Sequence, residues 1–282
     1  MSSASTKRRA KEDHYGYLHG YSDVEQERLI HQARFFESSV FAGIDWPASA
    51  KRILEPGSGV GAQTEILLRR FPDIHVTSVD RQPKQLARAK RYLAPQIKQG
   101  RVKLVEARGE QMPFGESSFD GAFICWVLEH VPQPVDLLKD VLRVLRPGAV
   151  LHCTEVLNSS FFLHPYAPAT LQYWFAFNDH QWNMGGDPFC GAKLSNHLTA
   201  AGFQNIETRV RNLLLDKRMP KAREEHLKAF YELLLSGAGE LKKAKRVDDK
   251  LLTELEAEWT AAMKDPDAVL FYSFVQARAV AL

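Results

Sequence analysis

Short apolar runs alternate with stretches of helical periodicity along the first half of the chain. We expect buried strands at residues 53–54, 75–80, 102–105, 121–127 and 149–156. Between them, residues 62–71 and 83–93 have helical character, and apolar side chains recur at helical spacing from Leu137 to Leu145. Strands that alternate with helices are typical of a parallel sheet connected by crossover helices. The pattern therefore predicts an α/β protein with a doubly wound sheet.

The second half of the chain breaks this rhythm. The stretch from Phe161 to Trp182 is dense in aromatic residues and predicts an inserted helical segment. The later elements we expect are a helix over 192–201 that ends at Gly202, a strand over 206–215, a charged helical stretch over 222–263 and a last strand over 269–280. The chain then divides into a tail (1–13), N-terminal cap helices (14–45), a ligand-binding core (46–157), an aromatic helical lid (158–190) and the remainder of the core (191–282), which carries a helical insertion (220–265).

Composition and charge narrow the class of protein. Hydrophobic residues form 45% of the 282 positions, which supports one large core with a modest lid. The net charge of +3 gives little reason to bind nucleic acid. Cys125, Cys153 and Cys190 are too far apart for a disulfide framework or paired metal ligands, so we expect a cytoplasmic protein without a metal site. The basic N-terminal residues precede no apolar run, so we expect neither a signal peptide nor a membrane span.

A glycine-rich loop follows the first predicted strand, where doubly wound sheets open their ligand crevice. Gly57, Gly59 and Ala62 match the spacing of a dinucleotide-binding loop, so a NAD-dependent oxidoreductase is one interpretation. Glu55 immediately precedes these glycines, where a carboxylate attracts a cationic amino-acid group and repels a pyrophosphate. Asp80 ends the second strand and can accept both hydroxyls of a ribose in either class. The loop favours a nucleoside sulfonium ligand and leaves the dinucleotide as the alternative.

Four further segments carry a family resemblance. They are Met112-Pro113-Phe114, Ser117-Ser118-Phe119-Asp120, Leu128-Glu129-His130-Val131 and Leu145-Arg146-Pro147-Gly148. With the glycine loop, the region 52–156 resembles the class I S-adenosylmethionine-dependent methyltransferases, especially the ubiquinone and menaquinone biosynthesis branch. The resemblance implies a Rossmann-like, seven-stranded, mostly parallel sheet with an antiparallel last strand and helical lid insertions. It also implies S-adenosylmethionine as the cofactor.

The resemblance carries specific roles onto positions of this chain. The cofactor-binding residues that it implies are Tyr21, Glu55, Gly57, Gly59, Asp80, Arg81, Gln82, Gly109, Glu110, Gln111, Cys125 and Trp126. Among them, Glu55 and the glycines of its loop would hold the methionine and ribose, and Asp80 would bind the ribose hydroxyls. Arg81 and Gln82 would lie beside the adenine, residues 109–111 would cover its edge, and Cys125 and Trp126 would lie near the methionine.

Two positions at this site have alternative interpretations. Many relatives carry an aspartate that accepts the adenine amino group four residues before the Met-Pro-Phe position, but this chain has Arg108 there, which cannot accept a hydrogen bond. Either Glu110 replaces the aspartate or the backbone alone recognises the adenine. The segment 15–21 and the amphipathic stretch that follows it through Arg34 resemble a leading helix that caps the cofactor. Tyr21 and His19 would then reach the methionine carboxylate or the reaction centre, and the alternative is aromatic packing of the helix on the sheet edge.

Methyl transfer from a sulfonium needs alignment, exclusion of water and, for a hydroxyl, thiol, acidic carbon or ammonium acceptor, a general base. We predict His180, in the aromatic lid beside Asp179, as the base, with His130 as a second candidate that also suits a structural role. The aromatic lid suits a flat or apolar small molecule, or a cation.

We therefore expect methylation of a small molecule at carbon, oxygen or nitrogen, in a chain for which a homodimer is left open. A non-catalytic cofactor-binding protein is a further alternative. A nucleic-acid or glutamine N-methyltransferase is disfavoured because the fourth strand ends in Cys125-Trp126-Val127-Leu128 rather than an Asn/Asp-Pro-Pro-aromatic signature.

Overall fold

The computed structural model describes residues 17–282, so the predicted tail and the first residues of the predicted cap region lie outside the described residues. The elements of the first half are α2 (Asp23–Phe35), α3 (Glu37–Val40), β1 (Arg52–Pro56), α4 (Ala62–Arg70), β2 (His75–Asp80), α5 (Pro83–Tyr92), α6 (Ala94–Lys98), β3 (Val102–Glu106), β4 (Phe119–Cys125), the 3-10 turn η1 (Leu128–His130), α7 (Pro134–Val144) and β5 (Leu145–Val156). The second half contains η2 (Asn158–Ser160), β6 (Phe162–His164), α8 (Pro168–Asn183), η3 (Cys190–Lys193), α9 (Leu194–Ala201), β7 (Gln204–Leu215), α10 (Pro220–Lys243), α11 (Asp249–Lys264) and β8 (Val269–Val280).

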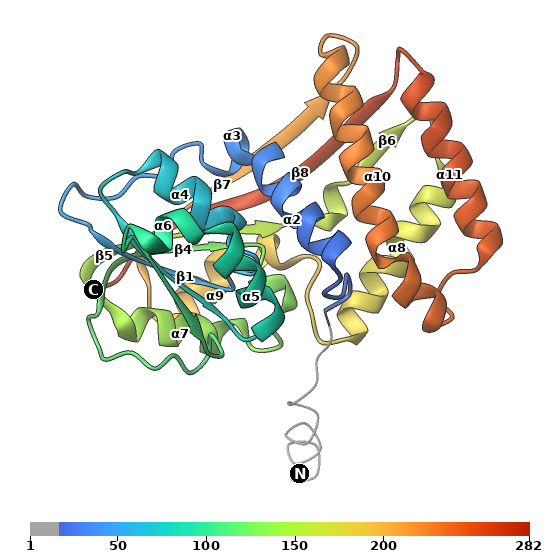
Figure 1. The fold of residues 1–282 in the computed structure, drawn as a ribbon. Coiled ribbons are helices and arrows are strands. Elements are labelled where there is room, and N and C mark those ends of the chain that lie inside the picture. The colour runs from blue at the N-terminus through green and yellow to red at the C-terminus, as the bar shows by residue number, and fades with distance from the viewer. Residues whose placement is uncertain (1–16) are drawn as a thin grey trace.

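One mixed sheet organises the molecule (Figure 1). Strands β3, β2, β1, β4 and β5 lie in this order and pair in parallel, and β8 pairs antiparallel with β5. Strand β7 lies along the other edge of β8. The central strands β1 and β4 are buried almost throughout because helices cover both faces of a parallel sheet. The predicted fold class, a doubly wound and mostly parallel sheet with an antiparallel last strand, is confirmed.

The structure adds an eighth strand that the sequence did not predict. Strand β6 lies at the start of the aromatic segment, which we expected to be helical throughout, and pairs with Val269–Phe271 of β8. Since β5 pairs with the following part of β8, up to Val280, β6 continues the line of β5 along the same edge. The strand is only three residues long, with Leu163 buried between exposed neighbours, so its alternation is hidden among the surrounding aromatic residues.

The predicted charged helical stretch is in fact two helices. Helix α10 ends at Lys243, and Lys245 adopts a positive φ of 56°, a left-handed conformation that a continuing helix does not allow. Asp248 then caps α11 by accepting a hydrogen bond from the Leu251 amide at 2.8 Å. The two helices pack on each other and on α8, and together they form a helical lid beside the sheet (Figure 1).

Two apolar cores lie on opposite faces of the sheet. The smaller core is built largely from α7, α9 and the strand residues packed against them. The larger core joins α2 and α4 to the lid helices. Helix α2 contacts both α4 and α10, so it bridges the sheet domain and the lid. Within residues 17–282, no helix combines the length and the apolar character that a membrane span needs.

Candidate active site

A cavity of about 250 Å³ lies where β1, β2 and β4 end and the lid begins. At one end it is lined by loop residues, namely Gly57, Ser58, Gly59, Val60, Asp80, Arg81, Gln82, Gly109 and Glu110. At the other end it is lined mainly by apolar side chains, namely Phe36, Trp126, Val156, Trp174, Phe177, Phe230, Leu233 and Tyr272. The first set will be called the loop end and the second set the aromatic chamber. One continuous cavity therefore has a loop-lined polar end and a largely apolar, aromatic end.

Asp80 organises the loop end. One of its carboxylate oxygens accepts the Gly59 amide and the other accepts the Gln82 amide, both at 2.8 Å. Burial raises the pKa of Asp80, and the two amides oppose that shift by stabilising the carboxylate. Asp80 thus connects the β1 loop to the β2 loop while lining the cavity, where a carboxylate can accept hydrogen bonds from ligand hydroxyls.

The backbone conformation and the close neighbours of position 57 require a glycine there. Its φ is +70°, and an added Cβ would lie 2.6 Å from both γ-methyl carbons of Val127. A side chain is therefore excluded on conformational and steric grounds. Because the loop lies so close to the end of β4, the backbone of Gly57 and Gly59 forms the floor of the loop end.

The structure corrects the role expected for Glu55. The Glu55 carboxyl is buried, accepts hydrogen bonds from the hydroxyls of Thr64 and Ser78, and does not belong to the cavity lining. Burial raises its pKa to about 8, so the group is protonated near neutral pH. It neither attracts a ligand ammonium nor repels a pyrophosphate, and its charge is therefore no argument against a dinucleotide. Glu55 instead joins β1 to α4 and β2.

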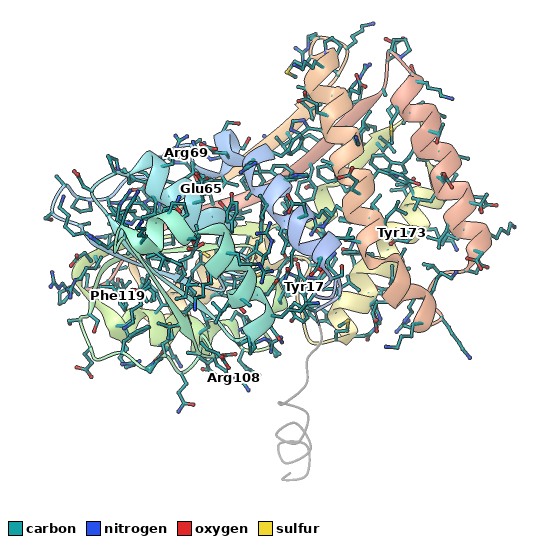
Figure 2. The ribbon with its side chains drawn as sticks, in the orientation of Figure 1. Tyr17, Glu65, Arg69, Arg108, Phe119 and Tyr173 are labelled. Carbon is teal, nitrogen blue, oxygen red and sulfur yellow. The ribbon has the colours of Figure 1, made fainter. Side chains whose placement is uncertain are left out.

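The other residues that the resemblance assigns to the cofactor divide into those that line the cavity and one that does not. Tyr21, Arg81, Gln82, Gly109 and Glu110 line the cavity. Gln111, in contrast, is exposed and does not line it, so the structure corrects that expectation. Arg108 is also exposed, with its guanidinium 3.8 Å from a carboxylate oxygen of Glu110, and Figure 2 shows it at the outer edge of the sheet domain. Glu110 is therefore the acidic side chain that this loop directs to the cavity.

Trp126 connects the loop end to the aromatic chamber. It follows β4 with a φ of +55°, which is uncommon for a bulky residue and costs conformational energy. Its indole meets Phe36 edge-on at 5.4 Å, and its buried Nε1 has no hydrogen-bond partner among residues 17–282. The adjacent Cys125 also lines the cavity, and burial raises its thiol pKa well above the usual value, so the thiol is neutral. Both residues line the cavity, and their place near the methionine stays a prediction.

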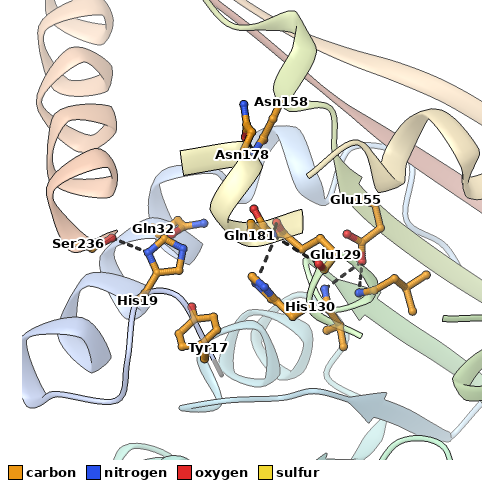
Figure 3. A network of polar contacts seen from close by, with 12 residues as sticks. Tyr17, His19, Gln32, Glu129, His130, Glu155, Asn158, Asn178, Gln181 and Ser236 are labelled. Atoms are coloured by element: carbon orange, nitrogen blue, oxygen red, sulfur yellow. Dashed lines mark hydrogen bonds and ion pairs between the residues drawn. The ribbon is translucent and has the colours of Figure 1, made fainter. Parts of the chain in front are cut away.

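A cluster of polar side chains faces the chamber from the side of the β4–α7 loop (Figure 3). The His130 Nε2 lies 3.6 Å from a carboxylate oxygen of Glu129, and Tyr17 packs edge-on against the His130 ring at 4.9 Å. Figure 2 shows Tyr17 between the sheet domain and the lid. Burial lowers the pKa of His130 to about 4 and raises that of Glu129 to about 7. His130 is therefore a neutral imidazole at pH 7.

His180, the preferred base from the sequence, lies elsewhere. It does not line the cavity, and its charged neighbours are Arg246 and Glu240 of the far side of the lid. Its pKa is lowered by burial and by Arg246. The structure corrects this expectation and leaves His130 as the sequence-predicted base that faces the cavity.

Several important residues were not predicted. Glu155 is fully buried at the end of β5 and accepts the amides of Val127 and Leu128 at 2.9 and 2.7 Å, so it fixes the loop that carries His130. Gln181 of α8 donates to Glu129 at 2.8 Å and connects the lid to the same loop. A Glu near the end of a buried strand was the available signal for Glu155. The contact with Gln181 joins positions 52 residues apart and has no local signature.

The loop end fits a nucleoside carrying an amino-acid sulfonium. A Cβ at Gly59 would meet no protein atom within 4 Å, so this glycine leaves open space next to the loop backbone. Asp80 supplies a carboxylate that can accept hydrogen bonds from hydroxyls, and Trp126, whose buried Nε1 has no hydrogen-bond partner among residues 17–282, also lines the cavity. These groups match the polar parts of S-adenosylmethionine.

Comparisons with known proteins agree with this class. A family model described as a methyltransferase domain matches residues 54–153. Methyltransferase str3 of Strobilurus tenacellus is 32% identical over 201 residues, which cover 66% of this chain and 68% of that protein. O-methyltransferase rstn1 of Aspergillus nomiae is 32% identical over 151 residues, 50% of this chain and 63% of that protein. The chain thus spans somewhat less than two thirds of that O-methyltransferase.

Solved structures share the fold. Phosphoethanolamine N-methyltransferase 2 of Haemonchus contortus, in complex with S-adenosyl-L-methionine, superimposes with a TM-score of 0.53 at 17% identity, over 89% of this chain and 52% of that chain. The YcgJ protein of Bacillus subtilis gives a TM-score of 0.54 at 13% identity, over 92% and 98%. The sheet order and the cavity at its carboxyl edge thus define a Rossmann-like methyltransferase fold. The chain belongs to the class I S-adenosylmethionine-dependent methyltransferases.

Proposed function

We propose that this protein transfers a methyl group from S-adenosylmethionine to a hydroxyl oxygen of a flat, largely apolar small molecule. The observation that carries the proposal is the continuity of the cavity, which joins a loop end suited to the nucleoside to an aromatic chamber containing a neutral histidine. The name of the O-methyltransferase from Aspergillus nomiae supports oxygen as the acceptor atom.

In this proposal the loop end holds the methyl donor. Asp80 accepts the ribose hydroxyls, while Arg81, Gln82, Gly109 and Glu110 surround the adenine. Gly57, Gly59, Tyr21, Cys125 and Trp126 enclose the methionine portion. When bound, S-adenosylmethionine supplies an electrophilic methyl group on a positively charged sulfur. The rings of Phe36 and Trp126 present aromatic faces and edges next to this position, which favours a cation and excludes water.

The chamber aligns the acceptor and shields the reaction. Phe36 lies between α2 and α3, Trp174 and Phe177 belong to α8, and Phe230 belongs to α10. Their rings pack against one another, in part through Phe161. A flat acceptor between such rings loses water and rotational freedom, and alignment of the reacting atoms accounts for much of the rate in a displacement of this type.

His130 and Glu129 form the proton-accepting pair. The His130 Nε2 is neutral and accepts the hydroxyl proton of the acceptor, after which the Glu129 carboxylate 3.6 Å away stabilises the imidazolium. Gln181 holds the other oxygen of Glu129 in place. Because burial raises the pKa of Glu129 to about 7, the carboxylate is formed around neutral pH and lost below it. Turnover should therefore fall as the pH drops below about 7.

The proposal is tested with purified protein, radiolabelled S-adenosylmethionine and a panel of hydroxylated aromatic compounds. We expect S-adenosylhomocysteine to bind in calorimetry and labelled methyl ether to form. His130→Gln should lower turnover about 100-fold or more and leave S-adenosylhomocysteine affinity unchanged. His180→Gln is the matched control outside the cavity and should keep turnover within about twofold of the native protein. Absence of S-adenosylhomocysteine binding would refute the proposed function, and full turnover in His130→Gln would refute the assigned base.

A further inference from the structure

Asn158 joins three segments at the wall of the aromatic chamber. Its side-chain nitrogen donates to the Asn178 carbonyl oxygen at 2.8 Å, and its side-chain oxygen accepts the Tyr272 hydroxyl at 2.8 Å. Its backbone carbonyl accepts the Trp174 indole N–H at 2.9 Å. Both Asn158 and Tyr272 are buried and line the cavity, and Figure 3 shows Asn158 next to Asn178 beyond Gln181. A hydrogen-bonded polar pair therefore lies within a wall that is otherwise largely apolar.

These contacts leave part of the hydrogen-bonding capacity of two cavity-lining residues unused. An amide nitrogen carries two hydrogens and a phenol oxygen has two lone pairs. Among residues 17–282, one hydrogen of the Asn158 amide is used by Asn178. The Tyr272 oxygen donates to Asn158 and interacts with the Leu157 backbone, which uses one lone pair. One N–H of Asn158 and one lone pair of Tyr272 remain, and they lie on adjacent residues of one network.

A hydroxyl group matches that remaining pair. Its oxygen can accept the Asn158 N–H while its hydrogen is donated to the Tyr272 oxygen, whereas a carbonyl or an ether can use only the first of these contacts. Burying a polar pair in an apolar chamber is unfavourable unless its hydrogen bonds are completed. We propose that Asn158 and Tyr272 form a subsite for a second hydroxyl of the acceptor, one that is recognised and not methylated. This inference rests on the proposed function and specifies its substrate class as a flat molecule with at least two hydroxyl groups.

The chemistry of the subsite explains why the hydroxyl held there keeps its proton. An amide nitrogen is not basic, and burial with the nearby Glu129 raises the pKa of Tyr272 well above its usual value, so its phenol stays protonated. No proton acceptor equivalent to His130 belongs to the Asn158–Tyr272 pair. The methylated hydroxyl is therefore the one at His130, and the second hydroxyl determines how the acceptor is oriented.

The test compares acceptor binding by calorimetry at saturating S-adenosylhomocysteine. The probes are the naphthols, with one hydroxyl, and the isomeric dihydroxynaphthalenes, with two. We expect the best dihydroxynaphthalene to bind the native protein roughly twofold to tenfold more tightly than the corresponding naphthol. Tyr272→Phe should abolish this preference and leave naphthol and S-adenosylhomocysteine affinity unchanged. The control is Tyr173→Phe, since Tyr173 is also a buried tyrosine that donates to a buried acceptor, the Leu234 carbonyl, but does not line the cavity.

A second variant keeps the test decisive if Tyr272→Phe does not fold. Asn158→Asp retains an oxygen for the Tyr272 hydroxyl and removes the N–H donors, so it should also abolish the preference. Equal binding of naphthols and dihydroxynaphthalenes to the native protein, or a preference that survives in the folded variants, overturns the subsite. A native protein that binds S-adenosylhomocysteine but no dihydroxynaphthalene overturns it as well. Failure to bind S-adenosylhomocysteine instead overturns the proposed function, so the two failures are distinguishable.

Discussion

Replacing Gly57 with alanine should damage the protein in two ways that can be separated. The first is conformational, because a φ of +70° costs a non-glycine residue about 1 to 2 kcal/mol. The second is steric, because the new Cβ would lie 2.6 Å from two methyl carbons of Val127, and overpacking of this kind typically costs about 1 to 3 kcal/mol. We therefore expect Gly57→Ala to lower the free energy of unfolding by about 2 to 5 kcal/mol.

Gly148 provides the matched control. Its φ is +82°, and an added Cβ would meet no atom within 4 Å, so Gly148→Ala carries the conformational cost without the steric one. We expect a loss of about 1 to 2 kcal/mol, and unchanged affinity for S-adenosylhomocysteine, because Gly148 lies outside the cavity lining. The free energy of unfolding is measured by urea denaturation, with and without the ligand.

The ligand distinguishes damage to the fold from damage to the site. A ligand present at 100 times its dissociation constant stabilises the folded state by about 2.7 kcal/mol. The native protein and Gly148→Ala should both gain this amount at the same ligand concentration, whereas Gly57→Ala should gain much less because its loop is displaced from Val127. If Gly57→Ala loses no more stability than Gly148→Ala and gains equally from the ligand, the close approach of loop and strand does not form the binding floor.

Three further predictions concern separate parts of the cavity. Asp80→Asn should weaken S-adenosylhomocysteine about tenfold to 100-fold in calorimetry, because charge-assisted hydrogen bonds contribute about 1.5 to 3 kcal/mol; unchanged affinity would exclude the ribose contact. Burial raises the folded pKa of Glu55 from 4.5 to about 8, so between these pH values the unfolded chain loses the proton first and stability falls as pH rises. In Glu55→Gln the slope of stability against pH should be shallower by up to about 1.4 kcal/mol per pH unit, and identical slopes would contradict a buried, protonated Glu55. Ser22 caps α2 by accepting the Glu25 amide at 3.1 Å, so Ser22→Ala should cost about 1 kcal/mol and also weaken acceptor binding. The corresponding α11 cap variant, Asp248→Ala, should cost as much stability and leave binding intact.

The sheet could be predicted because its signals are local. Strands β1, β2 and β3 begin and end close to the predicted apolar runs, and Gly202 ends α9 in a left-handed conformation as expected. Asp80 could be predicted because it ends a parallel strand at the carboxyl edge, where doubly wound sheets bind their ligands. Glu55 occupies a similar position and was misinterpreted, because its orientation depends on Thr64 and Ser78, hydroxyls 9 and 23 residues away.

The lid could not be predicted from its composition. Helix α8 carries aromatic side chains on all sides: Trp174 and Phe177 are buried at the cavity, whereas Phe175 and Trp182 are 65% and 56% exposed. A helix with aromatic side chains on every side has no single apolar stripe, so the sequence does not indicate which face is buried. His180 was predicted from its place in the aromatic lid beside Asp179, but its direction is set by packing of α8 on α10 and α11. Only the tertiary structure shows that His180 faces Arg246 and that Gln181 faces Glu129.

The two ends of the cavity are built from different kinds of contact, and this has a functional consequence. The loop end depends on backbone amides held by Asp80 and on Gly57, a position where a side chain does not fit. We therefore expect substitutions at these residues to affect donor binding. The chamber depends on side chains from the end of α2 and from α8, α10 and β8. These segments are far apart along the chain and come together when the lid packs beside the sheet. Side chains such as Phe230 and Leu233 can therefore change size or polarity without touching the loops that hold the donor. We therefore expect acceptor choice to depend on the chamber, where the surrounding rings select shape and where His130 and the proposed Asn158–Tyr272 subsite supply hydrogen bonds.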